Sequence, residues 1–392
     1  MKKKKLFLLA SLAAALAMTS CSSFDEPAAL DGDGMPLTRA GELTQTVTSE
    51  TALKRAVRDK KADITIGADF TMTSSLTLDY PVTIRGGVGK TLTTKAPFIC
   101  TSNVEFKDLT VVAETSTGSG AINMEAENID VVLKNVHLTQ NTAGTADAQA
   151  NVGIAILNTA CNNTLTIDST TMVLPGNYVR AVSMYNATKK TVGLEIKNSH
   201  ITCGTNLSFP STYARLLSFS NVKTAAGSPV VIDNSTLEGA YYVVNVNMDS
   251  EIQVDVKNNS VLDGRAAFNI WTPGFVGNVT GSTLIGRNNY SGPTESFANI
   301  VINQGATGCT LNLTNTIFKM DVIEKQQANE QYAVSFRASG PTLTLKGTLD
   351  IYSTAGNDVT SFFSANAGVE DITINQQELT SFNVYEIQPS DI

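Results

Sequence analysis

The sequence has few histidines and cysteines, and neither type is grouped. Its 392 residues include 2 histidines and 5 cysteines. Four of the cysteines, Cys100, Cys161, Cys203 and Cys309, are scattered and form no CxxC pair. Structural zinc sites and disulfide frameworks need closely spaced ligands or partners. We therefore expect no metal and no cofactor, and we expect these four thiols to be mostly buried or unpaired.

Basic residues are also scarce. The chain has 28 Lys and Arg against 36 Asp and Glu, a net charge of −8. Removal of the four lysines at residues 2–5 would leave 24 basic residues and a net charge of −12. Nucleic acids and anionic membrane surfaces bind proteins through basic patches. We therefore expect no nucleic-acid partner.

Long apolar runs are missing except near the start of the chain. Residues 6–18 are apolar but too few to span a bilayer, and they lie between the basic residues 2–5 and Thr19-Ser20-Cys21. This order is typical of a secretory signal peptide, which we assign to residues 1–20. Cys21 would then be the first residue of the mature chain.

This signal resembles that of bacterial lipoproteins, in which the cysteine after the cleavage site is acylated. Met18 departs mildly from that pattern, and the alternative is an ordinary signal peptide with a stray thiol at Cys21. Residues 22–26, Ser-Ser-Phe-Asp-Glu, are similar to the tag that directs lipoproteins of Bacteroidetes to the outer face of the outer membrane. The resemblance implies a protein held in the outer membrane by its lipid alone and facing the cell exterior.

Two short segments precede the main part of the chain. Residues 21–45 are rich in Ala, Asp, Gly and Pro without periodicity, which indicates a flexible acidic tether. A helix is expected near residues 49–59, because Thr48 or Ser49 can cap it and Leu53, Ala56 and Val57 share one face. One amphipathic helix ahead of many short strands is suited to covering the open end of a stack of strands.

A short unit then repeats along residues 46–392. Its clearest copy is Val230-Val-Ile-Asp-Asn-Ser-Thr-Leu237, and a strand with period-two alternation, such as residues 153–158, precedes most copies. The steps between copies range from 23 to 36 residues. The closing apolar residues of the copies are Val111, Leu138, Met172, Ile201, Leu237, Val261, Leu284, Ile317 and Leu349. Strands without intervening helices at such intervals predict stacked coils, each with a strand, a turn, a strand, a polar bend, a third strand and a variable loop.

The polar bend carries an Asn or Asp in most copies, at Asp108, Asn135, Asn198, Asn234 and Asn258. These residues tolerate left-handed backbone angles and can form a hydrogen-bonded ladder between coils. With the three strands per coil and the capping helix, this bend resembles the right-handed parallel β-helix of the pectate-lyase-like superfamily. The resemblance implies an all-β, right-handed parallel β-helix of about ten coils, at a coil spacing of about 4.8 Å.

In that superfamily, catalytic residues lie on the outward face of the first strand of each coil and on adjoining loops. Alternation places eleven residues there: Ser183, Tyr185, Ser218, Ser220, Asn245, Asn247, Asn269, Trp271, Asn303, Ser335 and Arg337. This set has no carboxylate, whereas glycoside hydrolases need two and calcium-dependent lyases of this fold need an acidic cluster. The paired aspartates and Gly-His-Gly of polygalacturonases are missing too. We therefore name no catalytic residue, and we read Asp249 and Glu251 as solvated loop charges and Arg337 as a surface residue.

The two histidines, His137 and His200, occupy one slot of the repeated unit. Other copies carry Thr110, Thr171, Thr236, Ser260, Thr283, Thr316 and Thr348 in this slot. Two coils apart, the imidazoles would lie about 10 Å from each other, which is too far for both to bind one metal ion. We interpret them as outward members of a threonine-like column.

A binding site is the better prediction. Trp271, the only tryptophan, is expected to face outward beside Asn247, Asn269 and Asn303, with Tyr185 farther along. An exposed aromatic ring flanked by amides offers a sugar a face to stack on and partners for its hydroxyls. The alternative is that Trp271 packs under the loop of residues 272–275.

These observations favour a non-catalytic surface lipoprotein that binds a polysaccharide or a host-surface glycan. Two alternatives stay open. The first is a polysaccharide lyase or glycoside hydrolase whose site is built from the loops at residues 204–213, 287–297 and 319–332. The second is a purely adhesive or structural surface protein without a pocket.

Overall fold

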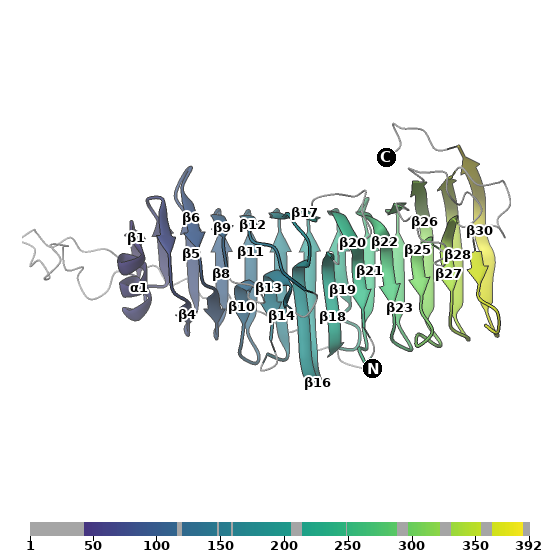
Figure 1. The fold of residues 1–392 in the computed structure, drawn as a ribbon, viewed down its shortest axis with the longest axis horizontal. Coiled ribbons are helices and arrows are strands. Elements are labelled where there is room, and N and C mark those ends of the chain that lie inside the picture. The colour runs from purple at the N-terminus through teal and green to yellow at the C-terminus, as the bar shows by residue number, and fades with distance from the viewer. Residues whose placement is uncertain are drawn as a thin grey trace, which may run out of the picture. The chain divides into compact units, whose positions relative to one another are not determined.

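The structure described is a computed structural model. The structure describes residues 43–115, 120–146, 149–157, 160–204, 214–247, 249–287, 297–321, 331–353 and 363–386. These residues belong to one compact unit, Leu43–Ile392. The expected signal peptide, Cys21 and nearly all of the tether lie outside the described residues. Figure 1 shows the strands of the compact unit following one another from β1 to β30.

The unit is a parallel β-helix with three strand faces, and each coil after the first, which holds only β1 and α1, contributes one strand to each face. The first face consists of β4 (Leu76–Leu78), β7 (Phe98–Cys100), β10 (Gly120–Met124), β13 (Asn151–Ile156), the start of β16 (Val179–Lys197), β18 (Arg215–Lys223), the ends of β20 (Thr236–Val246) and β22 (Val261–Ile270), β25 (Phe297–Ile302), β27 (Gln331–Phe336) and β29 (Phe363–Ala365). Successive members pair in parallel, as Ile154 with Val182 and Val182 with Leu217.

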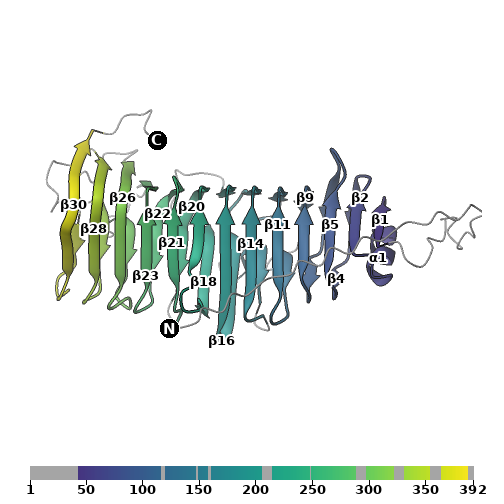
Figure 2. The same ribbon diagram turned by 180° about the vertical axis from the view of Figure 1, so that it is seen from behind.

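The second face lies before the polar bend, and Figure 2 shows several of its strands side by side. It consists of β1 (Thr44–Val47), β2 (Asp63–Ile66), β5 (Val82–Gly86), β8 (Val104–Lys107), β11 (Asp130–Lys134), β14 (Asn163–Asp168), the end of β16, β19 (Val230–Asp233), β21 (Gln253–Lys257), β23 (Val276–Thr280) and the starts of β26 (Thr310–Asp321), β28 (Thr342–Tyr352) and β30 (Thr373–Tyr385).

The third face follows the bend. It consists of β3 (Phe70–Met72), β6 (Thr91–Thr94), β9 (Thr110–Ala113), β12 (His137–Gln140), β15 (Thr171–Leu174), β17 (His200–Cys203), the starts of β20 and β22, β24 (Thr283–Arg287) and the ends of β26, β28 and β30. The main hydrophobic core runs between the three faces, with buried residues from Val47 to Ile351.

The helix expected near residues 49–59 is α1 (Glu50–Arg58). The Ser49 hydroxyl caps it by accepting a hydrogen bond of 3.2 Å from the amide of Ala52. Its apolar face, which includes Leu53 and Ala56, is buried at the β1 end of the core. The helix therefore covers apolar side chains that the first coil would otherwise expose to water.

The inward column of the third face follows the predicted period, with corrections of one or two residues in three coils. Val111, Leu138, Met172, Ile201 and Leu237 are buried as expected, and the column continues through Leu262, Leu284, Phe318 and Ile351. The assignments to Val261, Ile317 and Leu349 were wrong. In the first case Asn258 and Asn259 both have left-handed backbone angles, so that bend is one residue longer. In the second, Thr316 was taken for an outward residue, but it fills the buried position after the bend. In the third, the register shifts by one residue, so Leu349 pairs with Thr316 in that position and Ile351 takes the place in the column.

The polar bend has the predicted conformation. Asp108, Asn135, Asn198, Asn234 and Asn258 all have positive φ angles between 45° and 56°. The ladder forms between coils: Asn135 Nδ2 donates to Asp108 Oδ1 at 2.7 Å, and Asn234 Nδ2 donates to Asn198 Oδ1 at 2.8 Å. In two coils the acceptor is the residue before the left-handed one, since Asn198 donates to Asp168 and Asn258 donates to Asp233.

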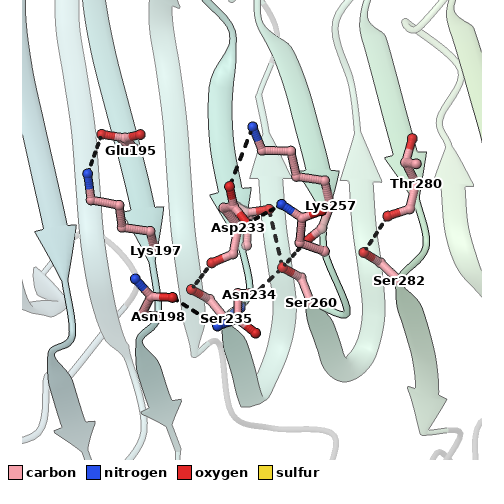
Figure 3. Close-up of polar contacts among 12 residues, drawn as sticks. Glu195, Lys197, Asn198, Asp233, Asn234, Ser235, Lys257, Ser260, Thr280 and Ser282 are labelled. Carbon is pink, nitrogen blue, oxygen red and sulfur yellow. Dashed lines mark hydrogen bonds and ion pairs between the residues drawn. The ribbon is translucent and has the colours of Figure 1, made fainter.

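Beside this ladder runs a buried column of hydroxyls, which Figure 3 shows at Ser235, Ser260 and Ser282. Each of these hydroxyls donates to a carbonyl in its own bend, as Ser235 Oγ to Asp233 O at 2.7 Å. Ser235 and Ser260 also accept a hydrogen bond from a backbone amide of the preceding coil, as Ser235 Oγ from Ser199 N at 3.1 Å. The small residue in the repeated unit thus satisfies backbone groups that would otherwise be buried without partners. The sequence-based fold class, a right-handed parallel β-helix with a capping helix, is confirmed.

Among the described residues, no helix has the length and apolar character needed to cross a membrane.

Candidate functional site

The first strand face alternates as predicted in the coils that carry the candidate site. Its inward positions, among them Phe219, Val244, Val246, Phe268 and Ile270, are buried. The outward positions are not uniformly accessible. Ser218, Asn245, Asn269, Asn303 and Ser335 are at most 3% exposed. Several residues that alternation places on the outward side of this face are therefore closed to solvent.

The buried amides of this face bind one another. Asn303 Nδ2 donates to Asn269 Oδ1 at 2.8 Å, Asn269 Nδ2 donates to Asn245 Oδ1 at 2.7 Å, and Asn245 Nδ2 donates to Asn247 Oδ1 at 3.0 Å. Asn303 Nδ2 also donates to the carbonyl of Ile270 at 3.1 Å. These bonds occupy polar groups that were predicted to meet sugar hydroxyls. Asn269 and Asn303 thus hold neighbouring coils together beneath the surface, and Asn247 is the half-buried end of this series of hydrogen-bonded amides.

Trp271 is exposed at the edge of this face. Its side chain is 38% exposed, whereas Phe275 of the following loop is fully buried and packs against Phe268 at a ring-centroid distance of 6.1 Å. The loop of residues 272–275 therefore does not cover Trp271 completely. The apolar residue of that loop enters the core, and the indole keeps part of its surface in solvent.

A shallow hollow of about 300 Å³ lies beside the indole. It is lined by Ser220, Asn247, Asp249 and Trp271. Asp249 and Glu251 follow β20, where the sequence indicated solvated charges, and Glu251 forms an exposed ion pair of 3.0 Å with Lys189. Sequence reasoning missed the place of Asp249 in the hollow, because nothing in the repeat shows which turn residues lean toward the first face.

Tyr185 belongs to the same column as Trp271. Tyr185 pairs with Ser220 of the next coil. Asn247 and Trp271 continue the column in the two coils after that, because the backbone N–H of Asn247 donates to the carbonyl of Phe219 and the backbone N–H of Trp271 donates to the carbonyl of Val246. Three steps between parallel strands separate the two aromatic residues, a span of about 14 Å. Tyr185 is 51% exposed. The column thus presents two aromatic side chains with a hydroxyl and an amide between them.

The histidines form no joint site. His137 and His200 lie two coils apart with Thr171 between them, as predicted. His200 Nε2 lies 2.7 Å from Glu238 Oε1 on an exposed surface. Three predicted members of this column were wrong. The strand register places Val261, Ile317 and Asp350 in the slot, in place of Ser260, Thr316 and Thr348 respectively. Among the described residues, no group of three His, Cys, Asp or Glu is placed to hold a metal ion.

The four cysteines are buried and free, as predicted. Burial raises the pKa of the Cys309 thiol to about 11. The pKa of Cys161 is raised first by its hydrogen bond to Glu127 and then by burial. Thiols with raised pKa values are poor nucleophiles at neutral pH, so these residues are structural.

A buried ion pair on the third face was not predicted. Arg287 binds Asp263 with two hydrogen bonds of 2.6 Å, and the side chains are 15% and 6% exposed. Burial raises the pKa of Asp263 even though Arg287 opposes this effect. Because Arg287 occupies both carboxylate oxygens, we assign the pair a structural role.

Comparisons with known proteins give the following results. No family model matches the chain, and a search of curated proteins finds no relative. Among solved structures, the chain is similar to the Dettilon tailspike protein with a TM-score of 0.42 and 11% identity, over 86% of this chain and 66% of that one. It is similar to a PL6 alginate lyase in complex with a trisaccharide, with a TM-score of 0.37 and 11% identity, over 89% and 97% of the two chains. It is also similar to the catalytic domain of a GH87 alpha-1,3-glucanase, with a TM-score of 0.32 and 14% identity, over 90% and 70%. At these TM-scores the activities of those proteins carry no inference about this chain.

The loops of the enzymatic alternative fall almost entirely on residues 205–213, 288–296 and 322–330, which lie outside the described residues.

Proposed function

We propose that this protein is a non-catalytic lipoprotein of the bacterial cell surface and that its β-helix binds glycan chains along the column from Tyr185 to Trp271. The observation that carries this proposal is the partly exposed indole of Trp271 beside a hollow of about 300 Å³ lined by Ser220, Asn247 and Asp249. An aromatic ring with polar groups at its margin matches a sugar ring, which has an apolar face and a rim of hydroxyls.

The column also has the extent that a polymer needs. A glycan chain laid across the strands from Tyr185 to Trp271 would meet the hydroxyl of Ser220 and the amide of Asn247 on the way. A hydroxyl and an amide each donate and accept hydrogen bonds, so they can bind sugar hydroxyls in either orientation. The span of about 14 Å exceeds a single sugar ring and favours oligosaccharides.

The proposed location is supported by the first residues of the chain. Residues 1–20 have the order of a signal peptide, and Cys21 is placed for acylation. A single acyl chain holds a protein on a membrane only weakly, so a stable anchor needs more than one chain on the cysteine. A lipid anchor followed by a flexible tether would present the β-helix to extracellular glycans.

The test uses residues 22–392, which omit the expected signal peptide and the acylated cysteine. This protein and its Trp271→Ala variant are applied to a panel of plant, host and microbial polysaccharides, and both retention and product release are measured. We expect saturable retention that is lost in the variant, without new reducing ends or unsaturated products. Product release would refute the non-catalytic part of the proposal and favour the lyase or hydrolase alternative, and absence of any retention would favour the adhesive alternative.

A further inference from the structure

The hollow beside Trp271 contains one ionisable side chain, the carboxylate of Asp249. Among the described residues this carboxylate makes no hydrogen bond or ion pair, while the neighbouring Glu251 is paired with Lys189. Asp249 has a left-handed backbone angle, with φ of 66°. Asparagine adopts that conformation as readily as aspartate. The turn therefore needs a short polar side chain but not a negative charge.

A carboxylate in this place discriminates between ligands by charge. It can only accept hydrogen bonds, so it suits the hydroxyl donors of a neutral sugar, and two neighbouring hydroxyls can bind its two oxygens. A uronate or sulfate group in the hollow would bring a second negative charge next to it, in a chain whose net charge is already −8. The arginine of the same column, Arg337, lies two coils beyond Trp271 on the side away from Asp249. The backbone N–H groups show this order, because that of Asn303 donates to the carbonyl of Ile270 and that of Arg337 donates to the carbonyl of Ile302.

We propose that the hollow selects neutral glycans, with Asp249 accepting hydrogen bonds from the hydroxyls of a sugar stacked on Trp271, and that it rejects glycans carrying uronate or sulfate groups. This inference rests on the proposed glycan-binding function and adds the class of ligand to it.

The test compares matched polysaccharides that differ in the acidic group, namely fully methyl-esterified with de-esterified polygalacturonate and β-1,4-mannan with β-1,4-polymannuronate. Retention on each is measured for the wild type, for Asp249→Asn and for Glu114→Gln. Glu114 is exposed and does not line the hollow, so its variant makes the same change in charge away from the site. The Asp249→Asn substitution keeps the size of the side chain and the turn conformation and removes only the charge.

We expect the wild type to retain at least one neutral polymer and to reject its acidic counterpart. Asp249→Asn should weaken neutral binding by about tenfold, as expected for loss of a hydrogen bond to a charged group, and should raise retention of the acidic polymer. Glu114→Gln should change neither. Equal or stronger wild-type retention of the acidic polymers, or an unchanged ratio in Asp249→Asn, would overturn the inference. The proposed function would still stand in that case if Trp271→Ala abolished retention, and it would fall only if no polymer were retained.

Discussion

Asn269 donates a hydrogen bond of 2.7 Å from its Nδ2 to Oδ1 of Asn245 in the preceding coil, and both side chains are at most 3% exposed. Two amides of the first face are therefore parts of the scaffold, although alternation alone would offer them to a ligand. Asn247, at the end of the same chain of hydrogen bonds, lines the hollow. The hydrogen-bonded amides thus divide into a buried supporting group and one member that lines the hollow.

This division predicts different effects for two asparagine variants. Asn269→Ala removes the partner of Asn245 and Asn303 in a buried place, so we expect a loss of about 1–3 kcal/mol in the free energy of unfolding. Asn247→Ala removes one acceptor of the buried Asn245 amide, so we expect a smaller loss of stability than in Asn269→Ala, which breaks two such bonds, together with a several-fold loss of glycan affinity. Thermal unfolding and retention on the glycan panel, measured on both variants, check this. Equal losses of affinity at temperatures where both variants are folded would contradict the division.

Tyr185 predicts a dependence on ligand length. Because Tyr185 lies about 14 Å from Trp271, only a ligand that spans three coils can contact both. In titrations with an oligosaccharide series, Tyr185→Ala should leave the affinity for disaccharides unchanged and should lower the affinity for longer chains by several-fold. Trp271→Ala should weaken binding at every length. A loss of disaccharide affinity in Tyr185→Ala would show that the ligand does not follow the column.

The capping helix predicts a dependence of stability on pH. Glu50 is partly desolvated, which opposes ionisation, but hydrogen bonds from Lys54, Thr73 and Ser74 outweigh this and lower the pKa of Glu50 to about 2 from an ordinary value of 4.5. A lowered pKa in the folded state stabilises the fold at pH values above 4.5, and the stabilisation is lost as the pH falls toward 2.

Glu50→Gln should therefore lower stability at neutral pH by about 1 kcal/mol, the range of partly exposed ion pairs. The variant and the wild type should converge as the pH approaches 2. Thermal unfolding of both proteins between pH 2 and 7 measures this difference, with Glu114→Gln as the control. A difference that stays constant across this range would contradict the assigned ionisation of Glu50.

The sequence was sufficient to predict the coil, because each part of it depends on local chemistry. The alternation in β18 and β22, the Asn at left-handed bends and the Ser49 cap are all properties of neighbouring residues. Two of the three errors arose where one extra residue shifted the register. The second left-handed residue at Asn259 moved Val261 outward and placed Leu262 in the core.

The site was less predictable, since exposure depends on neighbours in other coils. Alternation placed Asn269 of β22 and Trp271, the residue after this strand, on the same side, but it could not show that only Trp271 is accessible. It also could not show that the turn after β20 brings Asp249 into the hollow. Cross-coil contacts of this kind are set by insertions between strands, and the repeat does not encode them.

The most direct test of the account is the affinity of the Trp271→Ala variant for the best-retained glycan, measured by titration calorimetry beside the wild type. The control is Tyr385→Ala, because Tyr385 is also exposed, at 42%, but lies on the third face at the end of β30. We predict a loss of roughly tenfold or more for Trp271→Ala, as for a central aromatic contact, and no change for Tyr385→Ala. An unchanged affinity in a folded Trp271→Ala variant would contradict the assignment of the binding site to this column.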